Sequence, residues 1–279
     1  MRIFCLIACL CAAGLAHSEC RFADRSIENS IRTYQLCVEN GEPAKANVKS
    51  ALGHAPQDNA SYKSAIDEFT LELESAPESS AKPYFHRGLA YLAIGKERQA
   101  LRDFENYSSQ TPDSQAGHFY KGVALLERRK YRDAINAFET ALSVNSQNTI
   151  TRAPILFAKA RAELSTRSRE QALVSLDSAI SSDSEYAKAY FERARLREKS
   201  KQPAQAIEDY TRYIELRPQS AEACYNRGLI YQDLRQDHLA IQDFDRAIER
   251  DPGYLKPRAS KGLTYLWPVL PVLLVLMAG

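Results

Sequence analysis

A period of 34 residues is the feature that most restricts the fold of this chain. Four short stretches correspond to one another: RGLAY at 87–91, KGVAL at 121–125, RGLIY at 227–231 and KGLTY at 261–265. The first two lie 34 residues apart, as do the last two, and the frame extends to units at 81–114, 115–148, 153–186, 187–220 and 221–254. A repeat of this length predicts a solenoid, because each unit buries its apolar face only against its neighbours.

Two positions of every unit hold only small residues. Position 8 is occupied by Gly88, Gly122, Ala160, Ala194 and Gly228, and position 20 by Ala100, Ala134, Ala172, Ala206 and Ala240. Two antiparallel helices approach closely only where neither carries a bulky side chain, so these positions predict the crossing point of a helix hairpin. A large apolar residue follows in position 24: Phe104, Phe138, Leu176, Tyr210 and Phe244. Stretches rich in Ala, Glu, Arg and Leu favour helix, and we expect almost no strand.

The repeated unit resembles the tetratricopeptide repeat, and the stretch AEACYNRGLIYQDLRQDHLAIQDFDRAIERDP at 221–252 is close to the consensus of that family. The resemblance implies an all-α, right-handed superhelical solenoid of helix hairpins. It covers at least 81–254. Some positions depart from the family pattern: Cys224 and His118 stand where tryptophan is usual, and Ser146 and Ser184 replace a closing proline. These departures weaken the middle of the array without changing its register.

The repeat frame predicts the organisation of the whole chain. We expect a signal peptide at 1–18, an N-terminal helical segment at 19–45, a degenerate repeat at 46–80, repeats 1 and 2 at 81–148, repeats 3 to 5 at 153–254, the first helix of a partial sixth repeat at 255–266 and an apolar tail at 267–279.

The N-terminus has the pattern of a secretory signal peptide. Arg2 is followed by an apolar run from Ile3 to Leu15, and small residues at Gly14 and Ala16 suit cleavage near Ala16 or Ser18. We therefore expect an exported protein, periplasmic in a bacterium and secreted or membrane-anchored in a eukaryote.

Three cysteines remain after the predicted cleavage: Cys20, Cys37 and Cys224. In an oxidising compartment Cys20 and Cys37 are the candidate disulfide. A helix over about 26–38 would hold the two thiols apart unless residues 20–25 run back along it, so unpaired thiols are the open alternative.

The sequence offers no catalytic constellation, and we expect no enzyme activity and no cofactor or metal. It has no G-x-S-x-G, no H-E-x-x-H and no C-x-x-C, and its five histidines lie far apart along the chain. Carboxylates such as Asp103, Asp209 and Asp243 recur beside the ring of position 24, where packing and solvation explain them. A net charge of +2 gives no reason to expect nucleic-acid binding.

In the family that the chain resembles, the first helix of each unit lines a concave groove. Position 5, which faces that groove, holds an aromatic row of Phe85, Phe119, Phe157, Phe191 and Tyr225, and position 9 adds Arg161 and Arg195 near the centre. Aromatic and arginine side chains often dominate protein-binding energy, so these residues are the candidate partner-binding site. A purely packing role for the row is the other interpretation.

We expect an exported, non-catalytic scaffold that binds a protein or peptide ligand in this groove. A second hypothesis makes the chain an accessory factor of an envelope enzyme or a carbohydrate-handling complex, with the catalytic activity on a separate chain.

The tail has three interpretations. Residues 267–279 contain no charged residue but include Pro268 and Pro271, and they are too few to span a bilayer as a helix. The tail would cap the open end of the solenoid, associate with a membrane, or serve as a glycolipid-anchor signal that is removed.

Overall fold

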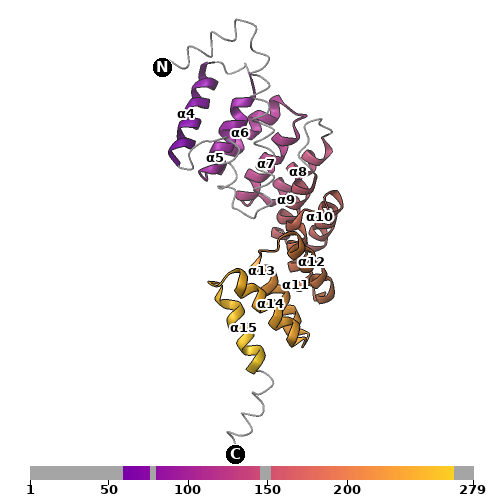
Figure 1. Cartoon of the computed structure of the whole chain (residues 1–279). Helices are drawn as coiled ribbons and strands as arrows, with labels where there is room; N and C mark the ends of the chain where they lie inside the picture. Colours follow the sequence, from indigo (N-terminus) through magenta and orange to yellow (C-terminus); the bar gives the residue numbers. More distant parts are fainter. Residues whose placement is uncertain (1–58, 76–79, 145–151, 267–279) are drawn as a thin grey trace, which may run out of the picture. The chain divides into compact units, whose positions relative to one another are not determined.

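A computed structural model describes residues 59–75, 80–144 and 152–266, and these residues form helices and no strand (Figure 1). The helices are α4 (Asn59–Ser75), α5 (Lys82–Ala93), α6 (Glu97–Gln110), α7 (Gln115–Glu127), α8 (Tyr131–Ser143), α9 (Arg152–Ser165), α10 (Arg169–Ser182), α11 (Ala187–Lys199), α12 (Pro203–Leu216), α13 (Ala221–Asp233), α14 (Asp237–Arg250) and α15 (Leu255–Leu266). The predicted all-α fold is confirmed.

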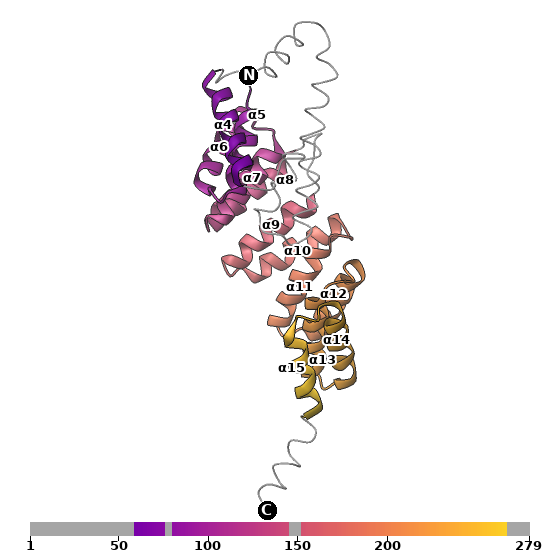
Figure 2. The same cartoon turned by 60° about the vertical axis from the view of Figure 1, so that its left-hand side comes forward.

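The chain divides into two compact units, Met1–Arg167 and Ser168–Gly279. In the first unit α4 to α9 pack in chain order, each helix against the next. In the second unit α10 to α15 do the same, and α13, α14 and α15 lie side by side (Figure 2). Described connections of three or four residues reverse the chain between helices, so the first helices of consecutive hairpins run parallel.

The small residue of position 8 lies directly under the ring of position 24. A Cβ atom added at Gly88 would lie 2.8 Å from Cε1 of Phe104, and one added at Gly228 would lie 2.7 Å from Cε1 of Phe244. Both rings are fully buried. Glycine is therefore required here by the closeness of the two helices rather than by its backbone freedom.

In each hairpin whose two helices the structure describes, from α5–α6 to α13–α14, the turn after the first helix has one residue in the left-handed region. In the α7–α8 turn, Arg129 has φ 59°. Its amide donates to the carbonyl of Leu126 at 2.9 Å, and the amide of Lys130 donates to the carbonyl of Leu125 at 2.9 Å. This pair of bonds is the Schellman motif, which satisfies the last carbonyls of a helix.

An arginine in position 7 connects the second helix of its own repeat to the second helix of the preceding repeat. Arg227 on α13 donates to both carboxylate oxygens of Asp243 on α14, at 2.7 and 2.8 Å, and to Oγ1 of Thr211 on α12 at 2.7 Å. Arg87 pairs in the same way with Asp103 and Thr70. Asp103, Asp209 and Asp243 are thus buried partners in ion pairs. The sequence had suggested packing and solvation for these carboxylates, and their burial contradicts the solvation.

The residue type in position 7 correlates with the residue type in position 23 of the same repeat. Where position 23 is Asp, position 7 is Arg, and this holds for Arg87, Arg193 and Arg227. Where position 23 is Ala137 or Ser175, position 7 is Lys121 or Lys159. Arg forms a bidentate pair with the carboxylate of position 23, whereas the ammonium group of Lys can pair with a carboxylate elsewhere. Lys159 pairs with Glu139 on α8 at 2.9 Å.

Replacing the glycine of position 8 should destabilise a complete hairpin and leave an incomplete one intact. We expect Gly228→Ala to lower the free energy of unfolding by about 1–2 kcal/mol, because the added methyl group overlaps Phe244. Gly262→Ala is the matched control, since its Cβ meets nothing within 4 Å, and it should be neutral or stabilising by up to about 1 kcal/mol. Urea denaturation measures both, and equal effects would contradict the packing role of position 8.

Removing a buried carboxylate should leave its arginine uncompensated. We expect Asp243→Ala to lower the free energy of unfolding by about 3–5 kcal/mol, since Arg227 is also buried. Glu215→Ala, which breaks the exposed pair with Arg212, should change stability little. If chemical denaturation gives the same small change in the free energy of unfolding for both variants, the buried pair does not stabilise the packed hairpins.

Candidate functional site

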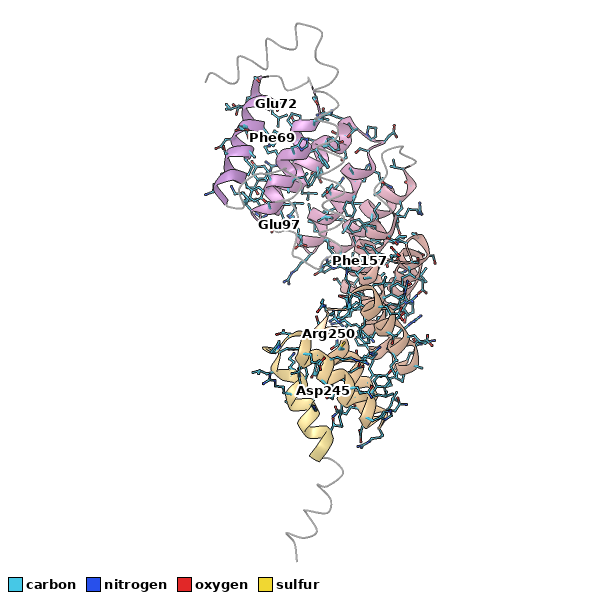
Figure 3. The ribbon with its side chains drawn as sticks, viewed as in Figure 1. Phe69, Glu72, Glu97, Phe157, Asp245 and Arg250 are labelled. Atoms are coloured by element: carbon cyan, nitrogen blue, oxygen red, sulfur yellow. The ribbon has the colours of Figure 1, made fainter. Side chains whose placement is uncertain are left out.

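The aromatic row differs between the two units. In the first unit Phe85, Phe119 and Phe157 are buried, with exposed fractions of 3%, 1% and 6% (Figure 3 labels Phe157 on α9). In the second unit Phe191 and Tyr225 are half-buried. The same repeat position therefore offers surface to a ligand in the second unit, and much less in the first.

Rings of the first unit account for the buried part of the row. Phe85 lies edge-on to Phe104 and Tyr120, with ring centroids 5.9 and 5.2 Å apart, and 4.9 Å from the ring of Tyr107. Phe119 packs on Tyr120 and on Phe138 in the same way. Position 5 in these hairpins therefore has a packing role, as the second interpretation of the row supposed. A role in binding stays a prediction.

In the second unit the aromatic residues are supported from behind. Phe191 on α11 lies 5.7 Å from the ring of Tyr210 and 4.9 Å from that of Tyr213. Tyr225 on α13 lies 5.9 Å from the ring of Phe244 and 5.3 Å from that of Tyr254. Its hydroxyl lies 3.4 Å from Oγ of Ser260 on α15, where either group can donate. Both rings are held in place while part of their surface stays accessible.

The two arginines of position 9 are exposed, Arg161 in the first unit and Arg195 in the second. Arg195 donates to Oε1 of Glu192, three residues earlier, at 3.2 Å, and 44% of its side chain is accessible. In the repeat that contains α13, position 9 is Leu229, which is half-buried. Phe191, Arg195, Tyr225 and Leu229 come from two consecutive parallel first helices, and we name them the α11–α13 face.

Two features of the described part of the chain bear on catalysis and metal binding: the placement of its potential metal ligands and the environment of Cys224. No group of three or more His, Cys, Asp or Glu among residues 59–75, 80–144 and 152–266 is placed to hold a metal ion. Cys224 is buried and unpaired, and the guanidinium of Arg250 contacts its sulfur. Burial raises the pKa of this thiol, which disfavours the reactive thiolate.

Other predicted features lie outside the described residues. These are the signal peptide, Cys20 and Cys37 with their candidate disulfide, and the tail at 267–279. Of the helices that the structure describes, none combines the length and the apolar character needed to cross a bilayer.

The cation of position 7 is the residue that sequence reasoning missed. Arg87, Arg193 and Arg227 are each followed by Asp 16 residues later, and this spacing recurs wherever position 7 is Arg in a complete unit. That co-occurrence could have identified the pairs, because an i, i+16 spacing joins the two helices of one hairpin.

Comparisons with known proteins agree with this architecture. Family models described as tetratricopeptide repeat match residues 85–148, 157–221 and 221–254, which together exceed half of the chain. No curated protein matches the sequence.

Several solved structures share the fold at low sequence identity. PilW, described as a widely conserved type IV pilus biogenesis factor, gives a TM-score of 0.61 at 17% identity, over 72% of this chain and 90% of PilW. YrrB, described as a TPR protein with an unusual peptide-binding site, gives 0.56 at 20% identity, over 71% of this chain and all of YrrB. MamA from Desulfovibrio magneticus RS-1 gives 0.55 at 18% identity, over 62% of this chain and 96% of the matched MamA chain. At these identities the likeness concerns the fold alone.

His86, beside Phe85 of the row, should make the first unit sensitive to acid. Its ring stacks on Phe69 with centroids 5.6 Å apart, and burial, together with the charge of Lys82, lowers its pKa to about 4 from an ordinary 6.5. The folded state disfavours the protonated ring, so the contribution of His86 to stability is fully present above about pH 6.5, where the ring is neutral in both states. This contribution is lost as the pH falls toward 4, because the unfolded chain takes up the proton first.

We therefore expect the free energy of unfolding to fall further between pH 7.5 and 4.5 in the native chain than in the variant His86→Phe. The difference should be about 1–2 kcal/mol, reduced from the full linkage value because the ring is partly hydrated. Urea denaturation at the two pH values measures it. The same pH dependence in both proteins would show that His86 titrates normally.

Proposed function

Because the chain belongs to the tetratricopeptide repeat family, we propose that it is a non-catalytic scaffold that binds a protein or peptide segment through the α11–α13 face. The observation that carries this proposal is the partial exposure of Phe191 and Tyr225, together with exposed Arg195, on parallel helices that pack against α12 and α14. The peptide-binding site named for YrrB supports the same class of function, by analogy of fold.

The chemistry of this face suits an extended peptide. A ring that is already immobilised by its neighbours loses little conformational entropy when a ligand covers it, so contact with Phe191 or Tyr225 favours binding. Arg195 adds a charged, forked donor that can bind a carboxylate or a backbone carbonyl. Leu229 extends the apolar surface on the α13 side.

The first unit contributes differently. Its aromatic residues at position 5 form the core of α5 to α9, so we assign to it a supporting role. Arg161 is exposed there, and a role for it in binding stays a separate prediction. Among the residues of the predicted binding row, those that we propose to contact a partner are therefore Phe191, Arg195 and Tyr225 of the α11–α13 face.

We also propose that the protein is exported. This part rests only on the sequence of residues 1–18, with its single basic residue, apolar run and small residues before the predicted cleavage point.

The proposal is tested with a peptide selected from a random display library against the intact chain. Arg195→Ala and Tyr225→Ala should each weaken its affinity by about 5- to 30-fold, that is by about 1–2 kcal/mol, as measured by calorimetry. Val174→Ala is the control, because it removes an apolar side chain that is 65% exposed on α10, a helix that contributes no residue to this face. Unchanged affinity in both test variants, with native circular dichroism, would contradict the assignment of the face.

A further inference from the structure

Most hairpins in the part of the chain that the structure describes carry a cation where the backbone favours glycine. The left-handed residue that follows the first helix is Gly95 in one hairpin, with φ 70°. In the other four it is Arg129, Arg167, Lys201 and Arg235, with φ between 57° and 65°. A side chain with a Cβ adopts this region at a cost that glycine avoids.

Helix dipoles do not explain this choice of residue. A cation is favourable at the end of the first helix, but the second helix begins two residues later with the opposite end of its dipole at the same place. The two effects largely offset each other at such a turn. The recurring Arg or Lys therefore indicates a use for the positive charge itself.

In the first unit these turns form a strongly basic edge. Residues 127–133 read ERRKYRD, and Arg129, Lys130 and Arg132 are exposed while Arg128 is half-buried. The α5–α6 turn adds exposed Lys96 and Arg98 at the same end, because α5 and α7 run parallel. We name these residues the basic edge: Lys96, Arg98, Arg128, Arg129, Lys130 and Arg132.

The charges of the basic edge are available to a partner. None of its residues forms an ion pair with a carboxylate of the described chain, although Lys96 lies 5.8 Å from the centre of the Tyr91 ring. Three acidic residues share this end of the unit: Glu97 at the start of α6 (Figure 3), Glu127 and Asp133. The six cations outnumber them, so the edge keeps a positive charge.

We propose that the basic edge of the first unit docks on an anionic lipid surface. A turn is the outermost point of a hairpin, so its long side chains meet a flat surface more readily than they enclose a ligand. A lipid surface supplies mobile negative charges at any spacing, which suits cations spread over two hairpins. The chain as a whole carries a net charge of only +2, so the attraction is local to this edge.

An acidic protein segment is the competing partner. It would need carboxylates spaced to match two separate turns, whereas a lipid surface has no such requirement. The charge pattern alone therefore favours the lipid surface, and the experiment distinguishes the two.

The test uses flotation of the intact chain with vesicles of phosphatidylcholine alone or with about 30% phosphatidylglycerol. Binding should require the anionic lipid, and it should fall steeply as salt is raised. The triple variant Arg128→Gln, Arg129→Gly, Lys130→Gln should weaken binding on the order of a hundredfold, since each cation near such a surface contributes about fivefold. Glycine at position 129 keeps the turn conformation, so this variant should unfold at the same urea concentration as the native chain or a higher one.

A control triple variant removes the same charge from the opposite ends of hairpins in the second unit: Arg217→Gln, Lys256→Gln and Arg258→Gln. It should bind anionic vesicles as the native chain does. Equal binding to neutral and anionic vesicles, or equal losses in the two triple variants, would overturn the proposal. Preferential binding to a polyglutamate peptide, lost in the first variant while vesicles stay unbound, would overturn it in favour of an acidic protein partner.

Discussion

The contact between a small residue in position 8 and the ring in position 24 sets the geometry of this protein. At Gly88, Gly122 and Gly228 the ring of the second helix lies so close that even a methyl group would overlap it. This approach fixes how each hairpin is oriented, and with it the direction in which positions 5, 7 and 9 point. Where position 7 is Arg87 or Arg227, its guanidinium contacts the second helix of its own hairpin and the second helix before it, so that successive hairpins are joined by partly buried hydrogen bonds as well as by apolar contact.

The all-α fold of helix hairpins could be predicted from the sequence, because a 34-residue period and small residues at fixed positions leave few alternatives. The exposure of individual rings could not. Phe85 and Phe191 occupy the same position, but Phe85 is surrounded by Tyr107 and Tyr120, whereas position 6 of the next first helix in the second unit is Asn226. The burial of a side chain depends on residues about 20 to 35 positions away, and one of these, Tyr120, belongs to the next repeat, so the pattern of a single repeat does not determine it.

The left-handed conformation of the turn residues could not be predicted from the sequence either. Glycine at position 95 is what a left-handed residue would lead one to expect, but Arg129, Lys201 and Arg235 adopt the same backbone without it. Arginine and lysine give no sign of positive φ in a sequence, because they are ordinary helix residues. Only the repeated backbone geometry shows that these cations occupy one structural position, and that they are placed at the tips of the hairpins.

The same repeat position thus has different surroundings in the two compact units. Apolar residues at position 5 build the core of the first unit, whereas the second unit keeps Phe191, Arg195 and Tyr225 partly open on the α11–α13 face. Hydrogen–deuterium exchange of the intact chain, with and without a peptide selected against it, tests this division most directly. The account predicts that the peptide slows exchange in α11 and α13. Slower exchange confined to α5 and α7, or to the second helices α12 and α14, would contradict it.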